Sequence, residues 1–376
     1  MRVDNPTAAE IAAVFRYLDA CASQGREPAF VKYLRLGRKT VRLVSYSQDY
    51  WWHVHNQLEY VLSDDAPAYD CTLVVWQENN FASLPTRLVT ADHSTSLYRQ
   101  YRIDRMRAPN RSLDHFILFD EKLLHAKPLL EVHPSSNLLT GWNPQSNTYY
   151  YADFDLSPEE FIKRGHIFVQ AIARILKEPQ SNLAHGAVVG LDNTGVLLCG
   201  MGYRGKSTFS VQALLDGFEY VSDDYLILEQ EQGQLLASPI YSIITLHPSM
   251  WQKLSPGVEA RFVSNNARKD KYVFNISGYH RDFRSRYPVK LCMFLNICHC
   301  KDPSIESGYK GQGFDEFVYS SVMQTGETQD IGTIYKLASF VNGLPFYRIN
   351  LSPNLAKNTA CLRRFLENYK SAQQGK

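Results

Sequence analysis

The chain has 376 residues, of which 44% are apolar and 21% are charged, and its net charge is +2. This length exceeds one typical domain and predicts two, because domains commonly contain about 100–200 residues. A nearly balanced charge favours neither nucleic acid nor an acidic membrane surface as a partner.

The sequence predicts neither a membrane span nor a secretory signal. The apolar runs fall well short of the ~20 residues that span a bilayer, and the first residues lack the apolar core of a signal peptide. The seven cysteines are an odd number, which favours reduced thiols over a disulfide framework. We therefore expect a cytoplasmic protein with no membrane partner.

The first part of the chain predicts a smaller α+β domain over residues 1–156. Thr7-Ala8-Ala9-Glu10 has the pattern of a capping box, and apolar residues then recur on one helical face. Residues 41–46 and 71–76 are expected to be strands. From residue 85 to about 140 the pattern is one of short strands and turns.

The second domain is expected over residues 157–376. Ser157-Pro158-Glu159-Glu160 forms a second capping box, which predicts a helix over residues 157–177. Two apolar runs, 187–189 and 196–198, flank the turn Asp192-Asn193-Thr194-Gly195, as in a β-hairpin.

The elements after this hairpin alternate between helix and strand. A helix is expected at 206–216 with Gly217 as its stop, followed by a short strand at 218–221. A hairpin around Gln232-Gly233, a buried strand at 289–297 and a closing helix at 356–369 come later, with residues 371–376 as a frayed tail.

A glycine-rich loop between the first hairpin and the helix matches G-x-x-x-x-G-K-[ST]. Glycines allow successive backbone N–H groups to converge on phosphate oxygens, and the following helix contributes its positive end. Lys206 would reach the β and γ phosphates of ATP, and the hydroxyl of Ser207 would help to hold Mg²⁺. The alternative is a glycine-rich turn without a ligand. The expected nucleotide-binding residues here are Gly200, Gly202, Tyr203, Arg204, Gly205, Lys206, Ser207 and Thr208.

Two adjacent carboxylates follow at the end of the next strand. Asp223 and Asp224 stand close after Lys206 in the sequence, so a short loop–helix–strand unit would bring both beside the phosphates. One could hold Mg²⁺ while the other accepts a proton from an attacking hydroxyl. A surface turn is the alternative. His185, just before the first strand of the unit, could orient an acceptor or tune an aspartate, or could serve only in packing.

These residues resemble a known family. Ala184-His185-Gly186, the glycine-rich loop and Tyr220-Val221-Ser222-Asp223-Asp224 are similar, in order and spacing, to the catalytic domain of HPr kinase/phosphorylase. That family shares its P-loop core and mixed sheet with ATP-type phosphoenolpyruvate carboxykinases. The specific similarity covers about residues 185–230, and a looser one continues to the C-terminus. The N-terminal part is similar to the variable front halves of stand-alone HPr-kinase-like proteins.

The resemblance implies roles for particular residues. His185 and Asp223 would serve proton transfer, Lys206 and Ser207 would bind phosphate and Mg²⁺, and Asp224 would support the metal. Which aspartate takes which role stays open. The looser likeness also singles out Lys271 as a cation that neutralises the γ-phosphate, with a solvated basic loop around Arg268 and Lys269 as the alternative.

The departures from the family pattern concern the acceptor. The family usually has serine and glycine where this chain has Gly202 and Tyr203. The family's acidic residue and Arg-Gly signature are missing from residues 238–248, which weakens the case for phosphorolysis, a second acidic metal ligand and HPr as the acceptor. We therefore expect a kinase that transfers the γ-phosphoryl group to a hydroxyl of a small molecule or peptide.

Several alternatives stay open. The chain could be a nucleotide-binding regulator without turnover, or a carboxykinase-like lyase, an alternative that only Arg204 supports. The acceptor, the role of the first domain and a homo-oligomeric state are not readable from the sequence. Cys298-His299-Cys300 lacks the spacing of a zinc site and is interpreted as packing at the end of a strand.

Overall fold

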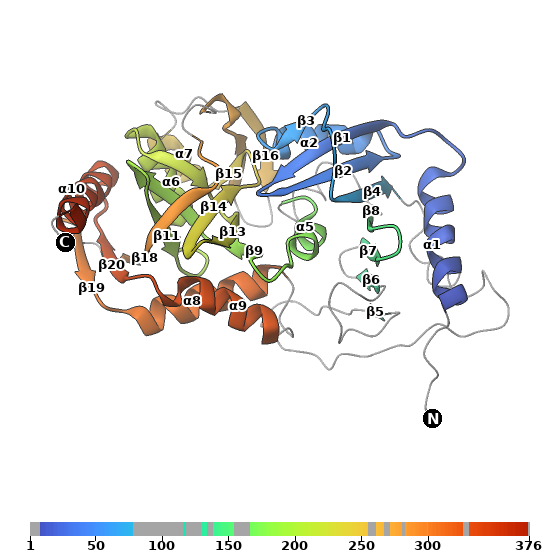
Figure 1. Ribbon diagram of the computed structural model, residues 1–376. Helices are drawn as coiled ribbons and strands as arrows, with labels where there is room; N and C mark the ends of the chain where they lie inside the picture. Colours follow the sequence, from blue (N-terminus) through green and yellow to red (C-terminus); the bar gives the residue numbers. More distant parts are fainter. Residues whose placement is uncertain are drawn as a thin grey trace. The chain divides into compact units, whose positions relative to one another are not determined.

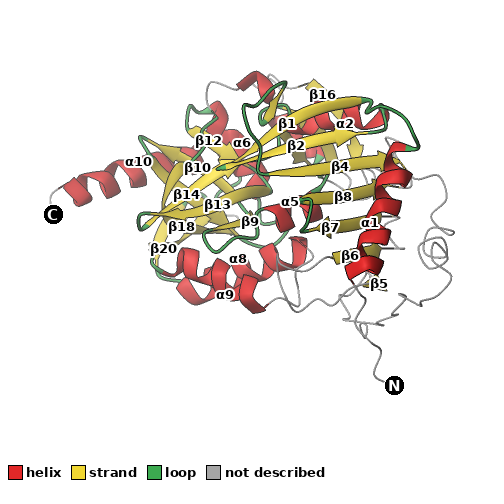
Figure 2. Cartoon of the chain, turned by 45° about the vertical axis from the view of Figure 1, so that its right-hand side comes forward, coloured by secondary structure: helices red, strands yellow, loops and turns green. Residues whose placement is uncertain are grey.

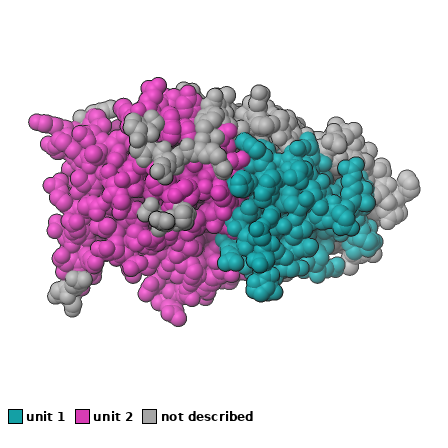
Figure 3. All heavy atoms as spheres, turned by 90° about the horizontal axis from the view of Figure 1, so that it is seen from above, with its two compact units in different colours: residues 1–35, 39–55, 62–171 teal, residues 36–38, 56–61, 172–376 magenta. Residues whose placement is uncertain are grey.

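A computed structural model describes residues 8–77, 116–117, 129–133, 138–153, 166–254, 261–266, 271–279, 283–298, 300–325 and 331–374. The chain divides into two compact units, coloured separately in Figure 3. Unit 1 comprises residues 1–35, 39–55 and 62–171, and unit 2 comprises residues 36–38, 56–61 and 172–376. The boundary predicted between residues 156 and 157 lies outside the described residues.

Unit 1 is built on an eight-stranded sheet of strand order β3-β1-β2-β4-β8-β7-β6-β5. The pairs β2–β4 and β4–β8 are parallel, so the sheet is mixed. Its elements are α1 (Ala8–Ser23), β1 (Phe30–Leu36), β2 (Lys39–Ser45), α2 (Asp49–Leu58), β3 (Leu62–Ser63), β4 (Cys71–Gln77), β5 (Phe116–Ile117), β6 (Leu129–His133), β7 (Leu138–Asn143) and β8 (Thr148–Asp153). The last residue of β1 and residues 56–58 of α2 belong to unit 2.

The predicted helix and strands of the first region are confirmed. Helix α1 lies against the sheet (Figure 2), and its buried residues Phe15 and Leu18 join Val74, Trp76 and Tyr150 in one apolar cluster. Strand β4 covers the predicted segment 71–76, and β2 covers the predicted segment 41–46 except its last residue. Most of the 85–140 region lies outside the described residues.

The helix predicted over residues 157–177 is confirmed over Val169–Ile175 and is wrong for residues 166–168. Helix α5 (Val169–Ile175) begins only at Val169, and Phe168 immediately before it has a φ of 58°. A residue with this left-handed backbone cannot continue a right-handed helix, so the chain turns there. Residues 154–165 lie outside the described residues.

Unit 2 contains a nine-stranded mixed sheet and a three-stranded sheet (Figure 1). The larger sheet has the main order β12-β10-β11-β18-β14-β13-β9, with β20 beside β18 and β19 beside β20. Its strands are β9 (Ser181–His185), β10 (Ala187–Leu191), β11 (Thr194–Cys199), β12 (Glu219–Ser222), β13 (Tyr225–Glu231), β14 (Gln234–Pro239), β18 (Tyr287–Ile297), β19 (Ser304–Ser307) and β20 (Phe346–Leu351). The smaller sheet, of order β15-β17-β16, comprises β15 (Ile243–Leu246), β16 (Arg261–Asn266) and β17 (Lys271–Asn275).

Helices cover both faces of the large sheet. Apolar residues of α6 (Lys206–Leu215) and α10 (Leu355–Gln374) pack with Leu291, Met293 and Leu295 of β18. Helices α8 (Lys310–Thr325) and α9 (Ile331–Asn342) pack on the other face, where Cys292 belongs to their cluster. The remaining helices are α7 (Pro248–Leu254) and a short 3₁₀ turn at Ser277–Tyr279.

The predicted elements of unit 2 are largely confirmed. Both hairpins have two-residue turns with positive φ, at Asp192 and Asn193 (49° and 61°) and at Gln232 and Gly233 (48° and 76°), as the right-handed twist of the strands requires. Gly217 follows α6 with a φ of 78°. The expected frayed tail is wrong for residues 371–374, because α10 continues to Gln374.

Two further observations bear on the expectations from composition. Among the described residues, no helix combines the length and hydropathy that a membrane crossing requires. The expectation of reduced thiols is confirmed for five cysteines, which are free: Cys21, Cys71, Cys199, Cys292 and Cys361. It is wrong for Cys298 and Cys300, which are joined by a disulfide just beyond β18.

Candidate functional site

The glycine-rich loop follows β11 directly, at the end of a strand in the middle of the large sheet. Strand β11 pairs parallel with β18 and antiparallel with β10, so both of its neighbours hold it in place. The loop backbone has left-handed residues at Gly200 (φ 139°), Tyr203 (φ 66°) and Gly205 (φ 88°). Tyr203 therefore adopts a conformation that glycine takes at lower cost, and its side chain is 80% exposed.

Helix α6 begins where the loop ends. Gly205 is its N-cap residue, and no side chain caps this end among the described residues. The first backbone N–H groups of a helix have no partner within the helix, and together with the helix dipole they favour an anion. This end of α6, which carries Ser207 and Thr208, can therefore receive a phosphate group.

Lys206, the first residue of α6, is folded back into the loop. Its Nζ donates to the carbonyl oxygens of Gly200 at 2.7 Å and Met201 at 3.1 Å. Burial lowers the pKa of Lys206, while the carboxylates of Asp224 and Asp223 act in the opposite direction. The ammonium group thus lies inside the loop, within electrostatic reach of both aspartates.

Asp223 lies at the end of β12 and is 2% exposed. Ser210 of α6 donates to its Oδ1 at 3.4 Å, whereas its Oδ2 has no hydrogen-bond partner among the described residues. Burial and the neighbouring Asp224 raise the pKa of Asp223 to about 7, and a hydrogen bond from Ser207 opposes this rise. The carboxylate is therefore costly to ionise where it stands, which is typical of functional sites.

Asp224 faces His185. Its backbone φ is 64°, and its carbonyl oxygen accepts the N–H of Gly186 at 2.9 Å, which ties the end of β12 to the start of β10. The Oδ1 of Asp224 lies 3.7 Å from Nε2 of His185. The backbone N–H of His185 in turn donates to Oγ of Ser321 on α8 at 3.0 Å.

The structure thus brings together the residues singled out by the sequence. Lys206 and Ser207 stand at the start of α6, Asp223 and Asp224 at the end of β12, and His185 at the end of β9. Lys271, the first residue of β17, places its Nζ 5.7 Å from the ring centroid of Tyr203. Arg268 and Lys269 lie outside the described residues.

Two residues of the site were missed from the sequence. Thr245 of β15 donates from Oγ1 to Oδ2 of Asp224 at 3.4 Å, and it lies in the stretch 238–248, which contains neither an acidic residue nor arginine. Glu316 of α8 accepts the N–H of Met201 at 3.1 Å and pairs with Arg204 at 3.4 Å. No local pattern marks Glu316, because its partners lie more than a hundred residues earlier in the chain.

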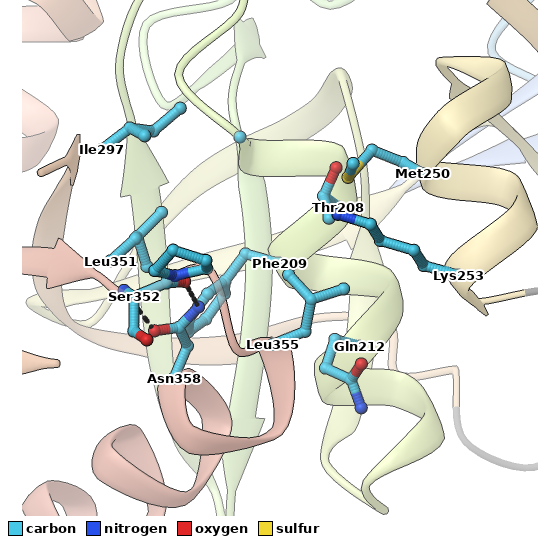
Figure 4. A pocket seen from close by; sticks show the side chains of 12 residues that line it. Thr208, Phe209, Gln212, Met250, Lys253, Ile297, Leu351, Ser352, Leu355 and Asn358 are labelled. Carbon is cyan, nitrogen blue, oxygen red and sulfur yellow. Dashed lines mark hydrogen bonds between the residues drawn. The ribbon is translucent and has the colours of Figure 1, made fainter. Parts of the chain in front are cut away.

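A pocket of about 240 Å³ adjoins the loop on the side of α6 and α10 (Figure 4). Gly205 of the loop is part of its lining, and the other walls come from α6, α7, β18 and the segment from β20 into α10. The lining residues are Gly205, Thr208, Phe209, Gln212, Met250, Lys253, Ile297, Leu351, Ser352, Pro353, Leu355 and Asn358.

The site also offers possible ligands for a metal ion. Among the described residues, His, Cys, Asp and Glu side chains do not gather in groups of three or more that could hold a metal ion. The donors that meet here are oxygens, from the hydroxyl of Ser207 and the carboxylates of Asp223 and Asp224. Oxygen donors suit Mg²⁺, which commonly takes one or two carboxylates and completes its shell with phosphate oxygens and water.

Comparisons with known proteins found little. No family model matches the chain, and no curated protein matches it. Among solved structures the chain is similar to the HPr(Ser) kinase/phosphatase from Coxiella burnetii, with a TM-score of 0.27 and 14% sequence identity over 52% of this chain and 99% of that chain. This similarity is too weak to establish a family, so a functional proposal has to rest on the site itself.

Proposed function

We propose that the protein is an ATP-dependent kinase of HPr-kinase-like type that transfers the γ-phosphoryl group to a hydroxyl of a small molecule or peptide. The observation that carries this proposal is the meeting of a glycine-rich loop, an uncapped helix start and two carboxylates. Lys206 is folded into the loop at 2.7 Å from the oxygen of Gly200. Phosphoryl transfer depends on positioning and on neutralising charge, which this set of groups can supply.

Each group has a part in this proposal. The N–H groups at the start of α6 and Nζ of Lys206 bind the phosphates. Asp223, whose Oδ2 has no hydrogen-bond partner among the described residues, accepts the proton of the attacking hydroxyl. His185, 3.7 Å from Asp224, holds that carboxylate in place beside the base.

Magnesium fits the same donors. The hydroxyl of Ser207 and the carboxylate of Asp224 would hold the ion beside the phosphates. When bound, Mg²⁺ supplies charge neutralisation on the β and γ phosphates. The protein residues then have to exclude water and align the acceptor hydroxyl with the γ-phosphate.

The test is an assay with Mg-ATP and hydroxyl acceptors, both small metabolites and serine peptides, in which ADP release is followed. Wild-type protein should release ADP in the presence of a suitable acceptor. Asp223→Asn should bind ATP as wild type does but lose transfer, because the amide cannot accept the proton. An Asp223→Asn variant with full activity would sink the assignment of the base.

A second function, a nucleotide-binding regulator without turnover, is favoured by one observation. Glu316 engages the loop through Met201 and Arg204, so α8 would respond when phosphates rearrange the loop. ATP binding without ADP release, across the same acceptors, would support this function over the kinase.

A further inference from the structure

The pocket beside the loop has a mostly apolar lining and is continuous with the start of α6. Thr208, Phe209 and Gln212 form the wall on α6 (Figure 4). Gly205, the N-cap residue of α6, joins this wall to the loop. A Cβ atom built on Gly205 would stand 3.5 Å from Leu351 and 3.9 Å from Ile297. The end of the loop therefore opens directly onto the apolar lining.

Little of the lining offers free polar groups to a ligand. The amide of Asn358 accepts from the N–H of Ser352 at 2.8 Å and donates to its carbonyl oxygen at 2.9 Å, which occupies both backbone groups. Pro353 has no backbone N–H that could donate a hydrogen bond. The Nε2 of Gln212 donates to Asp216 at 3.0 Å.

An apolar residue is left exposed at the rim. Ile297, at the end of β18, is 49% exposed although it lies beside Leu351 and the loop. Lys253 is the charged residue of the lining and comes from α7. A flat apolar ring inside the pocket would cover this lining and leave the lysine at its edge, near sugar oxygens or phosphates.

We propose that this pocket binds the purine base of the nucleotide whose phosphates lie at the start of α6. The inference rests on the proposed function, because it assumes that the loop binds phosphates. A nucleotide spans the two sites naturally: its phosphates meet the first N–H groups of α6, and its base lies against the side of the same helix. Apolar contact and shape hold the ring, since the polar groups of Ser352 and Asn358 are bound to each other.

The test fills the pocket with a large side chain and compares the binding of ATP with that of tripolyphosphate. Leu355→Trp narrows it from α10, and Met250→Trp narrows it from α7. Each variant should weaken ATP binding by at least about tenfold, since an indole ring takes the volume of the base. Tripolyphosphate, which has phosphates but no base, should bind each variant as it binds wild type. Ala356→Trp, an exposed position next to Leu355, is the matched control and should bind ATP normally.

The outcomes separate this inference from the proposed function. If wild type binds neither ATP nor tripolyphosphate in calorimetry, the proposed function fails. If wild type binds both but the filled variants still bind ATP at wild-type affinity, or lose both ligands equally, the base does not lie in this pocket. Unchanged tripolyphosphate binding also shows that the loop of a variant is folded. Because the two variants lie on different helices, misfolding of one of them does not leave the proposal untested.

Discussion

The carboxylate of Glu316 accepts the backbone N–H of Met201 at 3.1 Å, and its other oxygen lies 3.4 Å from the guanidinium of Arg204. Helix α8 therefore holds the first residues of the glycine-rich loop through one side chain. The guanidinium of Arg204 also stands 5.5 Å from the ring centroid of Phe294. A carboxylate at this place fixes the loop but brings negative charge toward the phosphates that the loop is proposed to bind.

The first prediction concerns this charge. Glu316→Gln keeps an oxygen that can accept from Met201 but removes the negative charge, so ATP should bind about threefold more tightly at low salt, with a smaller gain at high salt. Asp315→Asn makes the same change of charge one residue earlier on α8 and should leave affinity unchanged. Calorimetry at two salt concentrations checks both. Weaker binding by Glu316→Gln would show that the carboxylate supports the binding form of the loop.

The second prediction separates the two aspartates. Asp224→Asn removes one proposed oxygen ligand of Mg²⁺, so the Mg²⁺ concentration for half-maximal ADP release should rise about tenfold. Asp192→Asn, in an exposed turn of the first hairpin, is the control and should not change it. Titration of activity against Mg²⁺ at saturating ATP is the measurement. If the Mg²⁺ concentration for half-maximal ADP release rises in Asp223→Asn but not in Asp224→Asn, the proposed roles of the two aspartates are exchanged.

The sequence predicts most of the local structure around this site. The two-residue turns at Asp192-Asn193 and Gln232-Gly233 need positive φ, which is typical of Asp, Asn and Gly at three of these four positions. The loop, the helix that follows it and the strand before Asp223 follow from a short contiguous pattern. Such signals depend on neighbours in the chain, so they can be read without knowing the fold.

Other features depend on contacts between distant segments and could not be predicted. Thr245 and Glu316 reach the site only because β15 and α8 are placed there by the packing of unit 2. The residue types do not predict the disulfide between Cys298 and Cys300. They also do not predict the left-handed backbone at Phe168. The pocket could not be predicted from the sequence either, because its walls come from four separate segments.

The third prediction concerns the choice of base and follows from the lining of the pocket. Contact with an apolar lining depends on ring area, so ATP and GTP should bind within about fivefold of each other, and CTP should bind at least about fivefold more weakly. Competition against a fluorescent ATP analogue measures the three affinities under one condition. A strong preference for ATP over GTP would mean that polar groups of the pocket read the edge of the ring.

The fourth prediction concerns stability and the hairpin that presents the loop. A Cβ atom at Gly195 would lie 2.4 Å from the carbonyl oxygen of Pro288 and 3.0 Å from the ring of Tyr287. Strand β11 would have to move away from β18, so Gly195→Ala should lower the free energy of unfolding by about 2–3 kcal/mol.

The matched control for this change is Gly311→Ala in α8, where a Cβ would meet nothing within 4 Å. Alanine is the better helix former there, so this variant should gain up to about 1 kcal/mol. Urea unfolding followed by circular dichroism compares the two variants. If both glycines tolerate alanine equally, the close approach of β11 and β18 at Gly195 does not limit the stability of unit 2, and the loop would not depend on that contact for its position.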